Sequence, residues 1–184
     1  MNPPGNHDGA NAAGPDDAGP EEARARFWKL LGRQRVAMLT THAEGGLLRA
    51  RPLMLQTDAE DDHSGRLSFF VVAGSDVVRE VEADPSVGVT FADTDTDTYL
   101  SACGQAAIVV DTMRQKALWS AAAKPWFPEG PDDTRLRLLD VQLESAEYWD
   151  QRESKLVQLF KLAKAAATGR PPDDLGEHRS VGIR

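Results

Sequence analysis

The sequence predicts a mainly β protein with flanking helices (α+β), whose strands form an antiparallel barrel. Segments with the two-residue alternation of strands outnumber helical segments through the middle of the chain. Short turns and not βαβ crossovers join them, which indicates antiparallel neighbours. The chain has 184 residues, of which 41% are hydrophobic, and this suits one domain with a sizeable core.

The N-terminal part predicts a tail followed by a helix. Residues 1–19 are mainly Gly, Pro, Ala, Asn and Asp, so they bury too little apolar surface to offset the entropy of ordering. We therefore expect a disordered tail there. Pro20 at a first helical position and Gly32 just past the end mark a helix over 20–31.

The next segments predict a β-hairpin. Residues 35–41 and 47–57 have strand composition, and the turn 44–46 between them contains two glycines. Pro52 lies within the second strand, where it cannot donate a ladder hydrogen bond. We expect Pro52 at an edge or a bulge, where backbone groups stay accessible to a ligand.

The central segments predict three strands and a short helix. After a polar loop over 58–65, strands are expected over 66–72, 87–91 and 99–110. Gly104 lies inside the last of these strands. Glycine inside a strand often marks a bulge, so we expect an interruption there. Ser75 is expected to cap the short helix that follows the first of them.

The C-terminal third predicts a mixture of helices and strands. Asp111 caps a helix that stops before the aromatic loop 125–128. The further elements are a sixth strand over 139–143, a seventh short strand over 147–150, a helix that ends near Gly169 and a polar tail over 170–184. The folded domain is therefore expected to span 20–169.

Charge and motifs exclude several function classes. The net charge of −8 disfavours binding to nucleic acid or an anionic membrane, so a small molecule or another protein is the expected partner. The single cysteine, Cys103, and the four histidines lack metal-ligand spacing, so no metal is expected. The motifs GxSxG, GxGxxG and HExxH and the P-loop are absent. No secretion signal or run of about 18 apolar residues is visible, which favours the cytoplasm.

Several short segments carry a resemblance to a known family. The most specific are the loop Trp126-Phe127-Pro128 and the later pair Tyr148-Trp149, and weaker ones are 35–41, 50–54, 82–85 and 154–159. With these segments, residues 24–178 resemble the pyridoxamine 5'-phosphate oxidase-like FMN-binding split barrels, and within them the general stress protein 26 subgroup of bacteria. The resemblance implies a six-stranded antiparallel split β-barrel that forms a homodimer, with FMN in the clefts between the subunits.

The resemblance also implies roles for particular residues. Arg51 should contact the FMN phosphate, the backbone of Leu53 and Met54 should pass the flavin ring, and Ser75 should offer a hydroxyl to the phosphate. Physical chemistry agrees, because a guanidinium binds phosphate bidentately and a helix N-terminus favours an anion. The expected cofactor-binding residues are Arg51, Pro52, Leu53, Met54, Phe70, Val71, Val72, Ser75, Val77, Tyr99 and Trp126. No residue is assigned a catalytic role.

Other interpretations of these residues stay open. Arg51 could pair with an acidic residue, Ser75 could be only a helix cap, and Trp126 could pack against the barrel instead of closing over the ring of a neighbouring subunit. Tyr99 falls where the oxidases use a glutamine near the ring, which suits contact without dictating reactivity.

The sequence departs from the family at the phosphate side. Gln56 stands where the oxidases often have lysine, Val71 where threonine is usual, and Val77 where a phosphate-binding lysine is usual. Charged hydrogen bonds contribute about 1.5–3 kcal/mol each, so these changes predict weak flavin binding or none. Arg79 should face a different direction from Val77 and is not expected to replace the lysine.

Two functions remain in view. One is an FMN-dependent oxidoreductase, in which the flavin carries the redox chemistry. The other is a non-catalytic stress-response protein that stores or senses flavin, or has lost it. FAD, deazaflavin and haem stay open as ligands. Vitamin B6 oxidation is disfavoured, because the segment 176–184 has no basic run that matches the substrate-phosphate residues of the oxidases.

Overall fold

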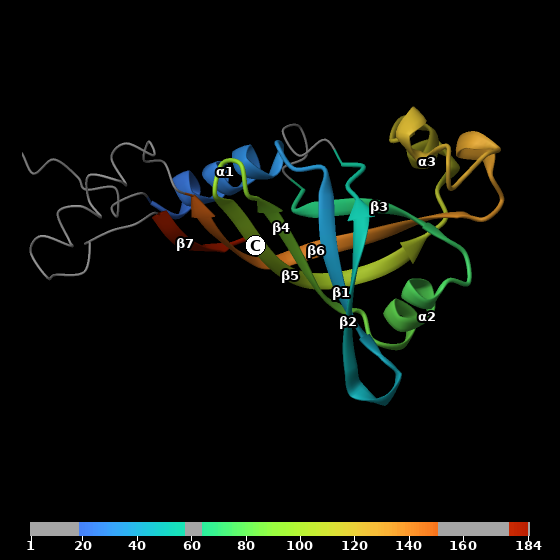
Figure 1. Cartoon of the computed structure of the whole chain (residues 1–184), viewed down its shortest axis with the longest axis horizontal. Coiled ribbons are helices and arrows are strands. Elements are labelled where there is room, and N and C mark those ends of the chain that lie inside the picture. Colours follow the sequence, from blue (N-terminus) through green and yellow to red (C-terminus); the bar gives the residue numbers. More distant parts are fainter. Residues whose placement is uncertain (1–18, 58–63, 151–176, 184) are drawn as a thin grey trace, which may run out of the picture.

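One antiparallel sheet dominates the computed structural model, which describes residues 19–57, 64–150 and 177–183. Six strands run in the order β2-β1-β4-β5-β6-β3, and β7 pairs with β6 (Figure 1). The strands are β1 (Val36–Ala43), β2 (Leu47–Met54), β3 (Arg66–Val72), β4 (Ser86–Asp93), β5 (Thr98–Val109), β6 (Leu136–Asp150) and β7 (Glu177–Gly182). The helices are α1 (Pro20–Leu31), α2 (Asp76–Ala83) and α3 (Thr112–Ala117), with short 3-10 turns η2 (Glu44–Gly46), η3 (Ala121–Ala123) and η4 (Gly130–Asp132).

The two outer strands of this order meet and close the sheet into a barrel. Just beyond the end of β2, Leu55 forms an isolated bridge with Phe69 of β3. The amide of Gln56 then donates to the carbonyl of Ser68 at 2.9 Å. The fold is therefore the mainly β, antiparallel split barrel that the sequence predicts. The crossing to β3 also explains why β2 ends at Met54 and not near residue 57.

Helix α1 lies along one side of the barrel (Figure 1) and has the bounds that the sequence predicts. Phe27, Leu30 and Leu31 are fully buried, and they join a core cluster with Val181 and Ile183 at the end of the described chain. The glycine after the helix, Gly32, donates its amide to the last turn. The apolar stripe of α1 is what directs this packing.

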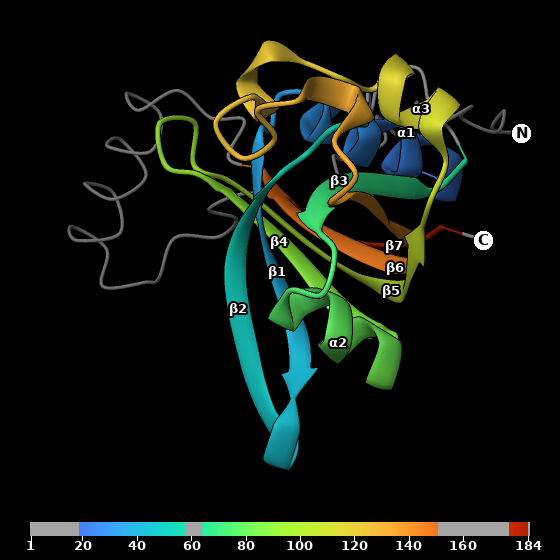
Figure 2. The ribbon, with the colours of Figure 1, turned by 90° about the vertical axis from the view of Figure 1, so that its right-hand side faces the viewer.

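The hairpin of β1 and β2 extends beyond the rest of the sheet (Figure 2). Within the described residues, strand β2 pairs with β1 alone over its length, and Pro52 lies opposite Met38. The prediction of an edge position for Pro52 is therefore confirmed. An edge strand tolerates proline because the missing N–H has no ladder partner to leave unpaired.

Two sequence predictions near the C-terminus are wrong. The strands expected over 139–143 and 147–150 are one continuous strand, β6. The polar tail expected over 170–184 does not hold for Glu177–Gly182, which form β7 against the far end of β6. Val181 and Ile183 are buried there, so apolar burial offsets the entropy of ordering this short segment. The disordered tail expected over 1–19, apart from Gly19, and the helix expected to end near Gly169 lie outside the described residues.

Gly104 interrupts β5 for a steric reason. The register between β5 and β6 shifts between Cys103 and Gly104, which is a β-bulge. A Cβ at position 104 would lie 2.1 Å from the carbonyl oxygen of Gln142 on β6. The close approach of the two backbones therefore requires glycine at this position.

Candidate functional site

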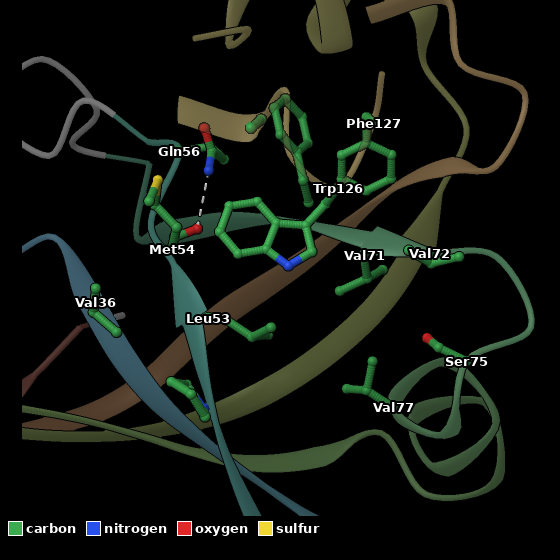
Figure 3. A pocket seen from close by; sticks show the side chains of 13 residues that line it. Val36, Leu53, Met54, Gln56, Val71, Val72, Ser75, Val77, Trp126 and Phe127 are labelled. Atoms are coloured by element: carbon green, nitrogen blue, oxygen red, sulfur yellow. Dashed lines mark hydrogen bonds between the residues drawn. The ribbon is translucent and has the colours of Figure 1, made fainter. Parts of the chain in front are cut away.

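A cavity of about 380 Å³ lies between β2, β3, the start of α2 and the loop after η3 (Figure 3). We name it the apolar cavity. Its lining residues are Val36, Pro52, Leu53, Met54, Gln56, Phe70, Val71, Val72, Ser75, Val77, Ala123, Trp126 and Phe127. All the predicted cofactor-binding residues line it except Arg51 and Tyr99. Val36, Ala123 and Phe127 line it without having been predicted.

The edge strand β2 forms one wall of the cavity. Pro52, Leu53 and Met54 follow one another along this wall, and Figure 3 shows Leu53 and Met54 beside the cavity. The Gln56 side-chain amide donates to the Met54 carbonyl at 3.2 Å, so the chain itself holds Gln56 in place. This wall offers backbone and apolar surface, which suits a flat ring.

The loop that carries Trp126 is fixed by its neighbour Phe127. Phe127 is buried and meets Phe70 of β3 edge to face, with ring centroids 6.3 Å apart. Trp126 is instead 61% exposed, and its indole reaches toward Leu53 and Met54 across the cavity (Figure 3). Packing of Trp126 into the barrel is therefore not what the structure shows. Its indole is free to cover a ligand in the apolar cavity.

Ser75 occupies the N-cap position of α2 without acting as a side-chain cap. Its hydroxyl makes no capping hydrogen bond. The Oγ atom is buried and has no hydrogen-bond partner within the described part of the chain. A buried hydroxyl without a partner costs free energy, so its position beside the cavity suits a ligand that accepts or donates a hydrogen bond there.

Arg51 faces α2 and not the apolar cavity. Its Nη2 pairs with the carboxylate of Glu80 and donates to the Thr41 hydroxyl at 3.3 Å. The Thr41 hydroxyl in turn donates to Glu80 at 2.6 Å. Arg49 reaches the same carboxylate at 3.0 Å. The acidic partner that the sequence left open for Arg51 is therefore Glu80, although Arg51 Nη1 is buried with no hydrogen-bond partner in the described ranges.

The carboxyl group of Glu80 is held in its charged form. Burial alone would raise the pKa of Glu80, but hydrogen bonds from Thr41 and Arg51 and the charges of Arg51 and Arg49 outweigh burial. The pKa of Glu80 is therefore lowered from its ordinary value of 4.5. Arg51 and Glu80 thus form a partly buried ion pair behind the cavity wall.

Tyr99 and Arg79, which were also considered from the sequence, lie away from the cavity. Tyr99 is on β5 between Ala92 and Trp149 and is 39% exposed. Arg79 turns back along α2, donates to the Gly74 carbonyl and pairs with Asp76. Neither residue lines the apolar cavity. The prediction that Arg79 faces away from Val77 is confirmed.

As far as the chain is described, the cavity lining has no charged side chain, and its polar side chains are Ser75 and Gln56. Among the described residues, no group of His, Cys, Asp and Glu side chains could hold a metal ion. No helix in the described part of the chain is long and apolar enough to cross a membrane. Because its described lining is uncharged, the apolar cavity suits the binding of a flat, largely apolar ligand. The same lining offers no side chain for acid or base chemistry.

Comparison of the sequence with protein families gives a result that agrees with this fold and cavity. The chain belongs to the pyridoxamine 5'-phosphate oxidase-like family, whose model matches residues 22–173. Protein bli-3 of Neurospora crassa is 23% identical in an alignment 146 positions long, which covers 74% of this chain and 69% of that protein.

Two solved structures extend the comparison within the general stress proteins. A protein described as general stress protein 26 from Jannaschia sp. CCS1 has a TM-score of 0.71 and 27% identity, over 89% of this chain and 99% of that one. A general stress FMN/FAD binding protein from Xanthomonas citri has a TM-score of 0.62 and 25% identity, over 73% of this chain and 92% of that one. The chain is thus a split barrel similar to the general stress protein 26 group.

Proposed function

We propose that this protein binds a flavin in the apolar cavity, with FMN as the expected form. The observation that carries the proposal is that β2, β3, α2 and the Trp126 loop bring residues from separate parts of the chain around one cavity. Family membership supports it, and so does the similarity to the FMN/FAD binding protein of Xanthomonas citri. FAD is the alternative flavin.

The residues present fit the ring and the uncharged side chain of a flavin. The volume of about 380 Å³ lies in the usual range for small-molecule sites, about 300–1,000 Å³. Pro52, Met54 and Trp126 supply the apolar surface that an aromatic ring needs. At the start of α2, the unpartnered hydroxyl of Ser75 offers a neutral hydrogen bond to the side chain of the flavin.

The bound flavin would supply the redox chemistry, and the protein would position and shield it. The backbone of Leu53 and Met54 would orient the ring, while the Trp126 indole would exclude water from one side. We propose that the protein acts as a flavin-dependent oxidoreductase in the cytoplasm. The uncharged cavity favours a second candidate as well, a stress-response protein that stores or senses flavin without turnover.

We also propose that the protein works as a homodimer. Val36, Met38, Tyr99 and Trp149 are exposed apolar residues on the same outer face of the sheet, because their strands pair in register. Such a face in a water-soluble protein favours burial against a partner. A second copy would bring Tyr99 and the exposed Trp126 into an interface beside the cavity.

Titration with FMN tests the proposed function. Purified, desalted protein should quench flavin fluorescence saturably. A Trp126→Ala variant should bind FMN about fivefold more weakly, since an aromatic contact of this kind contributes on the order of 1 kcal/mol. Met113→Ala is the matched control, because Met113 is 79% exposed on α3 and lies outside the cavity. Absence of FMN binding by the wild type would refute the proposal.

Oxidation of NAD(P)H by the FMN-loaded protein distinguishes the two candidate functions. Catalytic oxidation of NAD(P)H, well above that of free FMN at the same concentration, supports an oxidoreductase. Tight FMN binding without such turnover supports storage or sensing.

A further inference from the structure

The charges around the apolar cavity determine which part of a flavin the protein recognises. We infer that the cavity recognises the ring and the uncharged side chain of its ligand and not a terminal phosphate. Unphosphorylated flavin, of which riboflavin is the simplest, then binds about as tightly as FMN. This inference rests on the proposed function and specifies its ligand.

Among the residues that the structure describes, the cavity wall offers no cation to a phosphate. The wall at the start of α2 consists of Val71, Val72, Ser75 and Val77, and the hydroxyl of Ser75 is its polar side-chain group. The other polar side chain of the lining, Gln56, already donates to the Met54 carbonyl. A phosphate bound here would meet one neutral hydroxyl and the backbone of the helix.

Arg51 pairs with Glu80 through Nη2, while its Nη1 is buried without a hydrogen-bond partner in the described part of the chain. The Glu80 side chain is 10% exposed and that of Arg51 is 19% exposed, so the ion pair is largely shielded from water. If the guanidinium turned toward a ligand, Glu80 would lose a charged hydrogen bond in a poorly solvated position. The low pKa of Glu80 means that the carboxylate competes for Arg51 at neutral pH.

Two further arginines beside α2, Arg79 and Arg49, are also paired. Arg79 binds the Gly74 carbonyl and Asp76, and Arg49 lies 3.0 Å from Glu80 and 3.5 Å from Asp76. Asp76 is in the first turn of α2, where its negative charge opposes a second anion at the same helix end. The net electrostatic gain for a phosphate is therefore small.

The expected size of the effect follows from the kinds of hydrogen bond involved. A neutral hydrogen bond changes an equilibrium constant by about two- to tenfold, and each charged one by about ten- to a hundredfold. We therefore expect the dissociation constants of FMN and riboflavin to agree within about tenfold. A cation placed in the cavity wall should create the missing preference for FMN.

The test compares the two ligands on the full chain at one low salt concentration. FMN and riboflavin are titrated by flavin fluorescence against the wild type, Val77→Lys and Val77→Met. Val77 lines the cavity in the first turn of α2, so a lysine there should meet the phosphate. Methionine has a length similar to that of lysine but no charge. A change in the ratio of FMN affinity to riboflavin affinity that occurs in Val77→Lys and not in Val77→Met therefore results from the charge. Retained riboflavin binding shows that each variant is folded.

The outcomes separate this inference from the proposed function. The inference is supported if wild-type affinities agree within about tenfold and Val77→Lys, but not Val77→Met, favours FMN by a further tenfold or more. It is overturned if the wild type binds FMN more than about tenfold tighter than riboflavin, which leaves the flavin function intact. If neither flavin binds the wild type, the proposed function itself fails.

Discussion

Arg49 and Arg51 pair with the same carboxylate, Glu80, from positions two apart on β2, but they differ in burial. The Arg49 side chain is 53% exposed, whereas that of Arg51 is 19% exposed. We expect Arg51→Ala to lower the free energy of unfolding by about 3 kcal/mol, because it leaves Glu80 without its buried partner. Arg49→Ala should cost less than about 1 kcal/mol.

Urea denaturation at pH 7 measures both losses under the same conditions. Arg49→Ala is the matched control, since it removes a guanidinium from the same carboxylate. Equal losses in the two variants would show that burial of the Arg51 pair does not matter.

The lowered pKa of Glu80 predicts how stability depends on pH. A carboxyl group with a folded-state pKa below its unfolded value stabilises the fold above the unfolded value, about 4.5, and loses this contribution as the pH falls through the folded-state pKa. Glu80→Gln should therefore destabilise the protein most above pH 4.5, and the difference from the wild type should shrink at lower pH.

Denaturation curves of wild type and Glu80→Gln at pH 7 and at pH values below 4.5 check this prediction. The difference between the two proteins isolates Glu80 from Asp84, Asp93 and Asp133, whose pKa values are also lowered by hydrogen bonds. A difference that stays constant across this range would contradict it.

At the site, the sequence predicted the residue types better than their partners. The residues expected from β2, β3 and α2 do line one cavity. They could be predicted because the segments that carry them resemble those of a known family. Arg51 does not line the cavity, because it pairs with Glu80. The sequence could not predict this pairing, since Glu80 lies 29 residues away and only the fold brings α2 beside β2. Phe127 and Val36 were missed because lining a cavity depends on the packing of the loop and the barrel.

Among the elements, the bulge at Gly104 makes the sharpest demand on one residue. Gly104→Ala places a Cβ against the Gln142 carbonyl, and we expect a loss of about 3 kcal/mol in unfolding free energy. Gly88→Ala is the control on the neighbouring strand β4, because its Cβ would lie 3.8 Å from Thr40 in ordinary contact. Thermal denaturation of both variants tests the difference, and a tolerated Gly104→Ala would show that the sheet relaxes there.

The same bulge explains why β6 was mistaken for two strands. Across it, Cys103 pairs with Ser145 and Gly104 pairs with Leu143, so Glu144 is the extra residue. The buried positions change phase at Glu144, which breaks the two-residue alternation in the sequence. By contrast β3 and α1 have uninterrupted patterns, and their bounds agree with those predicted.

Strand β7 was missed because few of its residues are apolar, yet its contribution to the core is testable. Ile183, just after β7, is 4% exposed within the cluster that includes Phe27 and Leu31. Ile183→Ala should lower the unfolding free energy by about 2–4 kcal/mol through lost burial and a cavity. Chemical denaturation measures this. Ser180→Ala on the same strand is the control, and equal effects would argue against a core role for Ile183.

For the whole molecule, the exposed apolar face of the sheet predicts the oligomeric state. Wild-type protein should have twice the chain mass in light scattering after size exclusion. Met38→Glu should give monomers, because it places a charge on that face. Met113→Glu makes the same change on α3 and should leave the dimer intact. A wild-type monomer would contradict the proposed homodimer.

The packing of α1 against β7 has a consequence for synthesis of the chain. Part of the apolar face of α1 is covered by residues near Val181, which leave the ribosome long after Phe27. At about 5–20 residues per second, the delay is on the order of ten seconds. During this time the nascent chain exposes an apolar helix face that its own C-terminal strand will later cover, so a chaperone that binds such faces has its best access before translation reaches β7.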